Sequence, residues 1–128
     1  PCVGTIINLS SIAAQRTQSD LMGFSVSCAA LDQMTRCLAV SLAPERVRVN
    51  AVAFGSVMSA SLQDHLREHP DHRDAIIAAT PQGRIAGPTE VAEAVQFLAS
   101  DSSSFVTGEI LTVDGGRSLV DAVNTSLH

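Results

Sequence analysis

The chain has 128 residues, of which 45% are hydrophobic, and a formal net charge of −5 at pH 7. That length and apolar content are typical of one globular domain with a single core. Its eight basic side chains are all arginines and form no stripe or cluster, so we expect neither nucleic acid nor a membrane surface as a partner.

No apolar run approaches the roughly 20 residues that span a bilayer, and no charged segment followed by an apolar one opens the chain. We therefore expect a cytoplasmic protein. The chain begins at Pro1 without a methionine, which leaves two explanations open: removal of an initiator methionine before a small residue, or a piece of a longer chain.

Three cysteines, Cys2, Cys28 and Cys37, form no CxxC pair. An odd number without such a pair indicates reduced thiols rather than a disulfide framework or a structural zinc site. We expect Cys28 and Cys37 to be small buried hydrophobes.

The first predicted elements are a strand and a long helix. Residues 4–11 (GTIINLSS) begin apolar and end in small polar residues, which predicts a buried parallel strand that enters a functional loop. Residues 23–42, from Gly23 to Leu42, show the spacing of a helix with one apolar stripe, formed by Ala30, Leu31, Met34, Leu38 and Leu42. A second apolar surface, formed by Ala29, Cys37 and Val40, predicts two different neighbours, one of them another helix or subunit.

A second strand and a polar region follow. Residues 47–53 are rich in β-branched side chains and predict a strand that ends in a turn at residues 54–56. Two weak helical patterns, near residues 61–67 and 71–79, are joined at His69 and Pro70 and end at Thr80. This segment has the character of a polar, mobile lid.

The last predicted elements are a helix and a short strand. Pro88 and Glu90 mark a helix start, and the helix is expected to stop near Ser100. Residues 109–113 form a strand that ends at Asp114. The alternation of strands and helices predicts an α/β fold with a parallel sheet and right-handed crossovers.

Four sequence blocks carry a family resemblance. In order, and at the family's spacing over residues 4–116, these blocks resemble the classical short-chain dehydrogenases/reductases, with the bacterial 3-oxoacyl-carrier-protein reductases as the nearest type. The blocks are IINLSS from Ile6, RVNAVA from Arg48, GPTEVA from Gly87, and FVTG from Phe105 leading into VDGG from Val113.

The resemblance implies a Rossmann-like, doubly wound parallel sheet, of which residues 1–116 would be the C-terminal half with strands five to seven. Residues 117–128 would be a polar tail that is partly disordered or docks on a partner.

The glycine-rich turn that holds the cofactor pyrophosphate in this family has no counterpart, because no GxxxGxG occurs in the sequence. The resemblance therefore implies no cofactor for the isolated chain, and NAD(P) only if a missing half or an active partner completes it. A sheet of three strands would also leave an edge that a partner or the missing half must cover.

The catalytic pattern of the family is incomplete. Its members use a serine after the fifth strand, a tyrosine thirteen residues later and a lysine four beyond that, which places Phe24 and Cys28 at the tyrosine and lysine positions when counted from Ser11. Phenylalanine has no proton to transfer, and cysteine supplies no fixed positive charge. Losing both groups should remove most of the roughly 10²- to 10⁴-fold contribution of general acid–base catalysis.

Other positions retain parts of the pattern. Ser11 keeps the hydroxyl that steadies the substrate carbonyl in active relatives, although a loop serine also commonly bonds local backbone. Residues 54–59 resemble the family's nicotinamide loop, so Gly55, Val57 and Ser59 are predicted as vestigial cofactor contacts. Ser10, which precedes Ser11, is predicted as a fourth.

His65 and His69 are four residues apart, which is a possible metal-binding face. Without the glutamate that accompanies such pairs in zinc proteases, the pattern favours a solvated lid, and no metal is expected.

Three functions remain open. The first is a non-catalytic subunit or domain that associates with an active dehydrogenase/reductase through helices 23–42 and 89–99, as a homo- or hetero-oligomer. The alternative is a fragment of an NAD(P)-dependent oxidoreductase acting on a hydroxyl or keto group, such as a 3-hydroxyacyl or 3-oxoacyl thioester. The third is a small-molecule binding module that uses the cleft between Ser11 and the lid.

Overall fold

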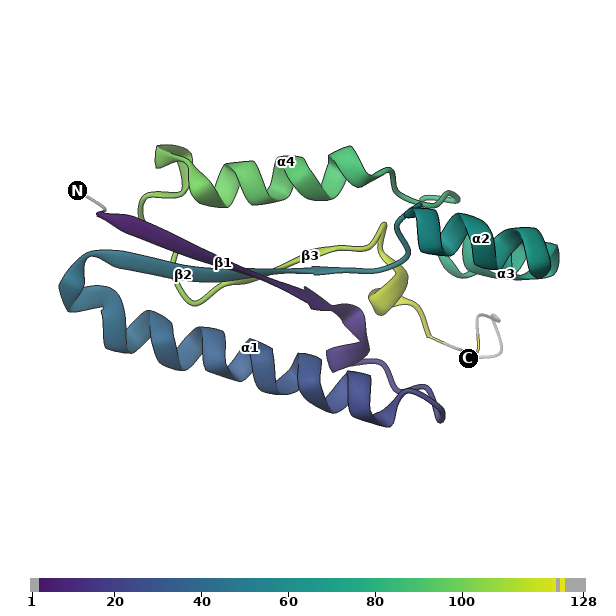
Figure 1. Ribbon diagram of the computed structural model, residues 1–128, viewed down its shortest axis with the longest axis horizontal. Coiled ribbons are helices and arrows are strands. Elements are labelled where there is room, and N and C mark those ends of the chain that lie inside the picture. The colour runs from purple at the N-terminus through teal and green to yellow at the C-terminus, as the bar shows by residue number, and fades with distance from the viewer. Residues whose placement is uncertain (1–2, 122, 124–128) are drawn as a thin grey trace.

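A computed structural model describes residues 3–121 and 123 and shows three parallel strands. The strands β1 (Gly4–Ser11), β2 (Val47–Phe54) and β3 (Ile110–Val113) lie in the order β1-β2-β3. The predicted parallel α/β architecture is confirmed, and each predicted strand agrees with the structure to within one residue. In Figure 1, helix α1 (Met22–Leu42) lies on one face of the sheet and helix α4 (Pro88–Ala99) on the other.

The remaining helices, α2 (Ala60–Glu68) and α3 (Pro70–Ala79), form a hairpin beyond the carboxyl end of β2 (Figure 1). The Ser59 hydroxyl accepts a hydrogen bond from the Leu62 N–H and so caps α2. Proline occupies the first position of α3, where the missing N–H costs no helical hydrogen bond. The predicted pair of helices is therefore present, with a break at His69.

The centre of the fold is β2, which is buried over six consecutive residues, Arg48 to Ala53. Two of these are polar. Arg48 donates to the carbonyls of Leu98, Ser100 and Val106 and to the Ser103 hydroxyl. Asn50 donates to the Val106 carbonyl and accepts from the Glu109 N–H.

These bonds tie the end of α4 and the entry to β3 beneath the central strand. The RVN block thus stabilises the fold through buried polar side chains that have their partners close by.

The face of α1 that packs on the sheet differs from the predicted stripe. The buried residues of α1 are Cys28, Asp32, Thr35 and Ala39, whereas Met34 is 47% exposed and Ala30 is exposed. The Thr35 hydroxyl accepts from the Asn8 amide of β1 at 3.0 Å, which helps to fix this orientation. The helix is apolar on more than one side. The spacing of its apolar residues therefore did not identify which residues lie at the middle of the buried face.

The second apolar surface of α1 is open in the structure, since Val40 is 78% exposed and Ala29 and Cys37 are also exposed. The prediction that Cys37 is buried is therefore wrong, whereas Cys28 is buried as predicted. Both are free thiols, and Cys2 lies outside the described residues.

The predicted tail is described only as far as residues 117–121 and 123; its remaining part lies outside the described residues. The described part begins with a short 3-10 turn, Arg117–Leu119. Over the same described residues, the structure holds no helix that is both long and apolar enough to span a membrane.

Candidate functional site: a cleft at the carboxyl ends of the strands

A cleft of about 790 Å³ opens where β1 and β2 end. Ser11 lies at the end of β1, Gly55 and Ser56 follow β2, and the α2–α3 hairpin forms one wall through residues that include His65 and Ile76. Ligands of open parallel sheets bind at this edge, because loops from neighbouring strands converge there. The predicted functional loop and lid therefore meet at one cleft.

Ser11 contributes a hydroxyl that already has a local partner. Its Oγ accepts a hydrogen bond from the Ala13 N–H at 3.1 Å, which caps the short 3-10 turn that follows β1. The hydroxyl proton remains available to donate. The local backbone contact expected for Ser11 is thus present, and a role of its hydroxyl toward a substrate stays a prediction.

The α1 side of the cleft consists of hydrocarbon. The residues that line it there are Leu21, which precedes the helix, and Phe24, which is 51% exposed. Cys28, one turn further along, is only 7% exposed and does not line the cleft. Among the described residues, α1 therefore brings neither a proton donor nor a cation to the cleft.

Of the four predicted vestigial cofactor contacts, only Gly55 reaches the cleft. Ser10 is buried, and its hydroxyl has no hydrogen-bond partner in the part of the chain that the structure describes. Val57 forms an isolated parallel bridge with Ala86, and the Ser59 hydroxyl is the cap of α2.

The residues present do not form a cofactor site of their own. A Cβ atom at Gly55 would lie 3.1 Å from the Cβ of Asp114. The glycine therefore allows the segments that follow β2 and β3 to lie close together, and the space beside it is not free for a ligand. No turn among the described residues carries a GxxxGxG sequence that could hold a pyrophosphate. We therefore derive no chemical step through a nicotinamide cofactor.

Arg117 is a cleft residue that the sequence did not reveal. Asp114 accepts hydrogen bonds from the N–H groups of Gly116 (2.9 Å) and Ser118 (2.8 Å), which fixes the turn on either side of Arg117. The guanidinium donates to the Ser56 hydroxyl at 2.8 Å.

Burial opposes ionisation of Asp114, but hydrogen bonds from Ser118 and Gly116, together with the charge of Arg117, hold its pKa below the ordinary value. An aspartate followed by two glycines is a signal for such a turn, although it does not indicate where Arg117 would lie.

Three histidines gather on the α2–α3 hairpin. The ring centroids of His65, His69 and His72 lie 4.8–4.9 Å apart, and His65 Nε2 and His72 Nδ1 share a hydrogen bond of 2.7 Å. His65 and His72 line the cleft. Within residues 3–121 and 123, no three His, Cys, Asp or Glu side chains are arranged to hold a metal ion.

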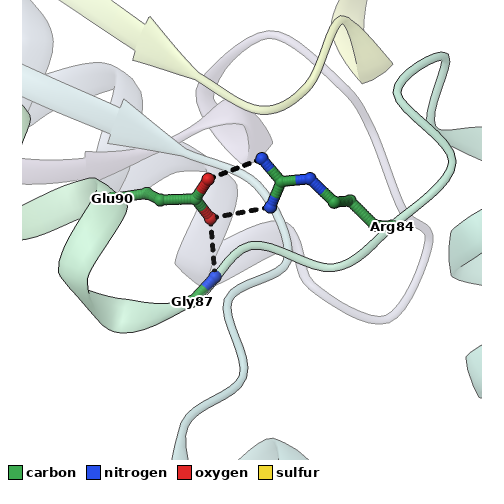
Figure 2. A network of polar contacts seen from close by, with 3 residues as sticks. All are labelled: Arg84, Gly87 and Glu90. Atoms are coloured by element: carbon green, nitrogen blue, oxygen red, sulfur yellow. Dashed lines mark hydrogen bonds and ion pairs between the residues drawn. The ribbon is translucent and has the colours of Figure 1, made fainter.

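Figure 2 shows the polar network at the start of α4. Arg84 and Glu90 also line a second cavity, of about 540 Å³. Glu90 accepts two hydrogen bonds from Arg84 and one from the Gly87 N–H at 2.8 Å. The bonds from Arg84 and then from Gly87 lower the pKa of Glu90 to about 2. Since both carboxylate oxygens are occupied, this network stabilises the helix start rather than offering a binding group.

The comparisons with known proteins agree with this architecture. Residues 2–118 match the family model described as enoyl-(acyl carrier protein) reductase. The chain is also 43% identical, over 120 residues, to the cis-4-hydroxycyclohexanecarboxylate dehydrogenase of Sinomonas cyclohexanicum. The chain belongs to the short-chain dehydrogenase/reductase family. The match to that relative covers 91% of this chain and 46% of the relative, so the chain spans about half its length.

Solved structures of the family show the same half-fold. The ligand-free aldohexose dehydrogenase of Thermoplasma acidophilum superposes with a TM-score of 0.87 at 30% identity, covering 94% of this chain and 50% of that one. A gluconate 5-dehydrogenase from Burkholderia cenocepacia, in complex with NADP and tartrate, gives a TM-score of 0.85 at 27% identity, with coverage of 91% and 46%. The predicted family and the Rossmann-like half-fold are confirmed.

Proposed function

We propose that this chain is a non-catalytic short-chain dehydrogenase/reductase subunit or domain that associates with an active partner of the same family. The observation that carries the proposal is the hydrocarbon wall that α1 presents to the cleft, with Phe24 lining the same cleft as Ser11 and Cys28 buried. By the family pattern, Phe24 and Cys28 occupy the positions of the catalytic tyrosine and lysine.

The chemistry of those two side chains supports the proposal. Hydride transfer to a carbonyl requires a proton donor at the developing alkoxide, and a phenyl ring has none. A neighbouring ammonium group would lower the pKa of such a donor, but a buried thiol carries no fixed positive charge.

Exposed apolar side chains on two helices support association. On α1 the exposed fractions are 74% for Met22, 63% for Val26 and 78% for Val40. On the other side of the sheet, Phe97 and Phe105 are 41% and 102% exposed. Monomers rarely leave large apolar surfaces open, so we place homo- or hetero-oligomer contacts on α1 and α4. The proposal includes a cytoplasmic location and neither nucleic acid nor a membrane as a partner.

A second candidate is a fragment of an NAD(P)-dependent oxidoreductase that acts on a hydroxyl or keto group, such as a 3-hydroxyacyl or 3-oxoacyl thioester. The Sinomonas relative is by name a dehydrogenase of a hydroxycyclohexanecarboxylate, and the Burkholderia relative binds NADP. In this case another half of the fold supplies the pyrophosphate site, and NAD(P) binds only to the completed protein.

A turnover assay separates the two candidates. The purified protein, alone and with co-expressed products of neighbouring genes, is incubated with NADH or NADPH and a β-keto thioester, and cofactor oxidation is followed at its absorbance. We expect no turnover by the chain alone. Cofactor turnover by the pure chain would overturn the non-catalytic proposal.

Association is tested by molar mass in solution. Replacing Val40 by Glu should reduce the mass or the co-purified partner, because a charge would be buried at the interface. Gln63→Glu on α2 adds the same carboxylate away from both proposed contact helices and should leave the mass unchanged. An unchanged mass for Val40→Glu would place the interface elsewhere.

Placing the family's tyrosine and lysine in this chain tests whether the cofactor-binding half of the fold is also needed for activity. The double variant Phe24→Tyr with Cys28→Lys should show no measurable turnover as an isolated chain, because no pyrophosphate site accompanies it. Any gain of activity would show that the cofactor half is not required.

A further inference from the structure

The cleft beside Ser11 carries more positive than negative charge, unlike the chain as a whole. Its charged lining consists of Arg16, Arg117 and Asp121, with the imidazoles of His65 and His72 beside them. The whole chain has a net charge of −5. A concave site of one sign focuses the electric field and attracts ligands of the opposite sign.

Arg117 is held in place to meet such a ligand. The turn that carries it is fixed by the two hydrogen bonds to Asp114, and one guanidinium nitrogen is fixed by the Ser56 hydroxyl. A guanidinium has five N–H donors, and the others of Arg117 have no hydrogen-bond partner among the described residues. A half-buried arginine with free donors is suited to a carboxylate or phosphate group.

Two carboxylates offset part of this charge: Asp114, which interacts electrostatically with Arg117, and Asp121 in the lining. The Arg16 guanidinium has no hydrogen-bond or ion-pair partner within residues 3–121 and 123, and it lies at the rim of the same cleft. Asp121 is the only carboxylate among the described lining residues, and one of its oxygens accepts from the Val123 N–H. The described lining therefore holds two arginines and one partly occupied carboxylate.

The rest of the lining is mixed, with polar Ser11, Thr17, Gln18 and Ser56 beside an apolar set. Hydrocarbon side chains from four parts of the chain line it: Ile12, Leu21, Phe24, Leu62, Ile76 and Val120. The volume of about 790 Å³ lies within the range of small-molecule sites.

We propose that this cleft binds a small organic anion, with an apolar body on the Phe24 side and one carboxylate or phosphate group on Arg117 and Arg16. This proposal goes beyond subunit association, because it assigns a ligand class to the cleft of a chain that lacks the catalytic pair.

The test compares matched ligands by NMR titration of the purified, isotope-labelled protein at about pH 7 and low salt. Cyclohexanecarboxylate is the anion, cyclohexanecarboxamide is its neutral counterpart of the same shape, and cyclohexyl phosphate tests the other anionic group. We expect the carboxylate or the phosphate ester to bind about tenfold more tightly than the amide, since hydrogen bonds to charged groups are the stronger ones. The preference between the two anions then identifies the anionic group.

Two variants locate the binding. Arg117→Gln should reduce the affinity for the preferred anion to that for the amide, about tenfold, while amide binding persists. Arg16→Gln, at an exposed side chain without partners, should give a smaller loss and keeps the test valid if Arg117→Gln unfolds. Arg73→Gln on α3, outside the cleft lining, is the control and should change nothing.

Equal affinities for all three ligands, or chemical shift changes confined to residues outside the cleft, would overturn the proposal. That result would leave the non-catalytic role untouched, whereas turnover by the pure chain would overturn that role and leave anion binding in place.

Discussion

Arginine plays opposite parts in two regions of this molecule. Beneath β2, Arg48 is 7% exposed and makes four hydrogen bonds, three of them to backbone carbonyls at the end of α4 and the entry to β3. At the cleft, the guanidinium of Arg117 makes one hydrogen bond and that of Arg16 makes none among the described residues. The same side chain stabilises the fold where carbonyls surround it, and remains available to a ligand where they do not.

The largest effect on stability is expected when the buried guanidinium of Arg48 is removed. Arg48→Met keeps much of the apolar stem but removes the guanidinium bonds to the carbonyls of Leu98, Ser100 and Val106, so the free energy of unfolding should fall by about 3 kcal/mol. Urea unfolding followed by circular dichroism measures the change. Arg36→Met, at an exposed position of α1, should change it by less than about 0.5 kcal/mol.

If the two variants were equally stable, the network beneath β2 would not hold α4 in place, and the contrast with the cleft arginines would be lost.

The turn that positions Arg117 gives the next largest effect. Gly115 has φ +64°, and a Cβ there would lie 2.8 Å from the Thr80 Cγ2 atom, so Gly115→Ala should lose about 2 kcal/mol of stability. Gly83→Ala is the matched control, because Gly83 has φ +71° and no atom within 4 Å of the added Cβ. It should lose about 1 kcal/mol from backbone strain alone.

The difference between the two alanine variants measures the contact with Thr80. An equal loss of stability in both variants would mean that Thr80 moves away from the added Cβ atom at no cost in free energy. The turn that carries Arg117 would then not be rigid.

The smallest effect concerns Glu90, whose pKa is lowered to about 2 by Arg84 and Gly87. Since the folded pKa lies below the unfolded value of about 4.3, the contribution of Glu90 is complete above that value and is lost as the pH falls towards 2. The melting temperatures of the natural protein and Glu90→Gln should therefore differ at pH 6 and converge by about pH 2. Glu93→Gln, an exposed position on the same helix, should show little difference at either pH.

A difference between the natural protein and Glu90→Gln that stayed constant from neutral to acidic pH would show that the charge of Glu90 contributes nothing to the start of α4.

Much of the fold could be predicted from the sequence because its signals are local. The β-branched run of residues 47–53 predicted β2, Pro88 and Glu90 predicted the start of α4, and the four sequence blocks indicated the family. The family spacing grouped Ser11 with Phe24 and Cys28, and in the structure Ser11 and Phe24 line the cleft whereas Cys28 does not.

Other features depended on contacts between distant segments. The sequence of α1 is apolar on several sides, so only packing against β1 and β2 decided that Thr35 and Ala39 face inwards while Met34 and Cys37 remain exposed. The bond between Arg117 and Ser56 spans 61 residues, and the pairing of His65 with His72 requires the chain to turn back at His69.

By itself, therefore, the sequence determined the order of the elements and the family, and it predicted the loss of the catalytic tyrosine and lysine, because each depends on residue type and local spacing. Only the tertiary structure decided which helix face is buried and that two arginines line one cleft, because side chains far apart in the chain meet only after the sheet has formed.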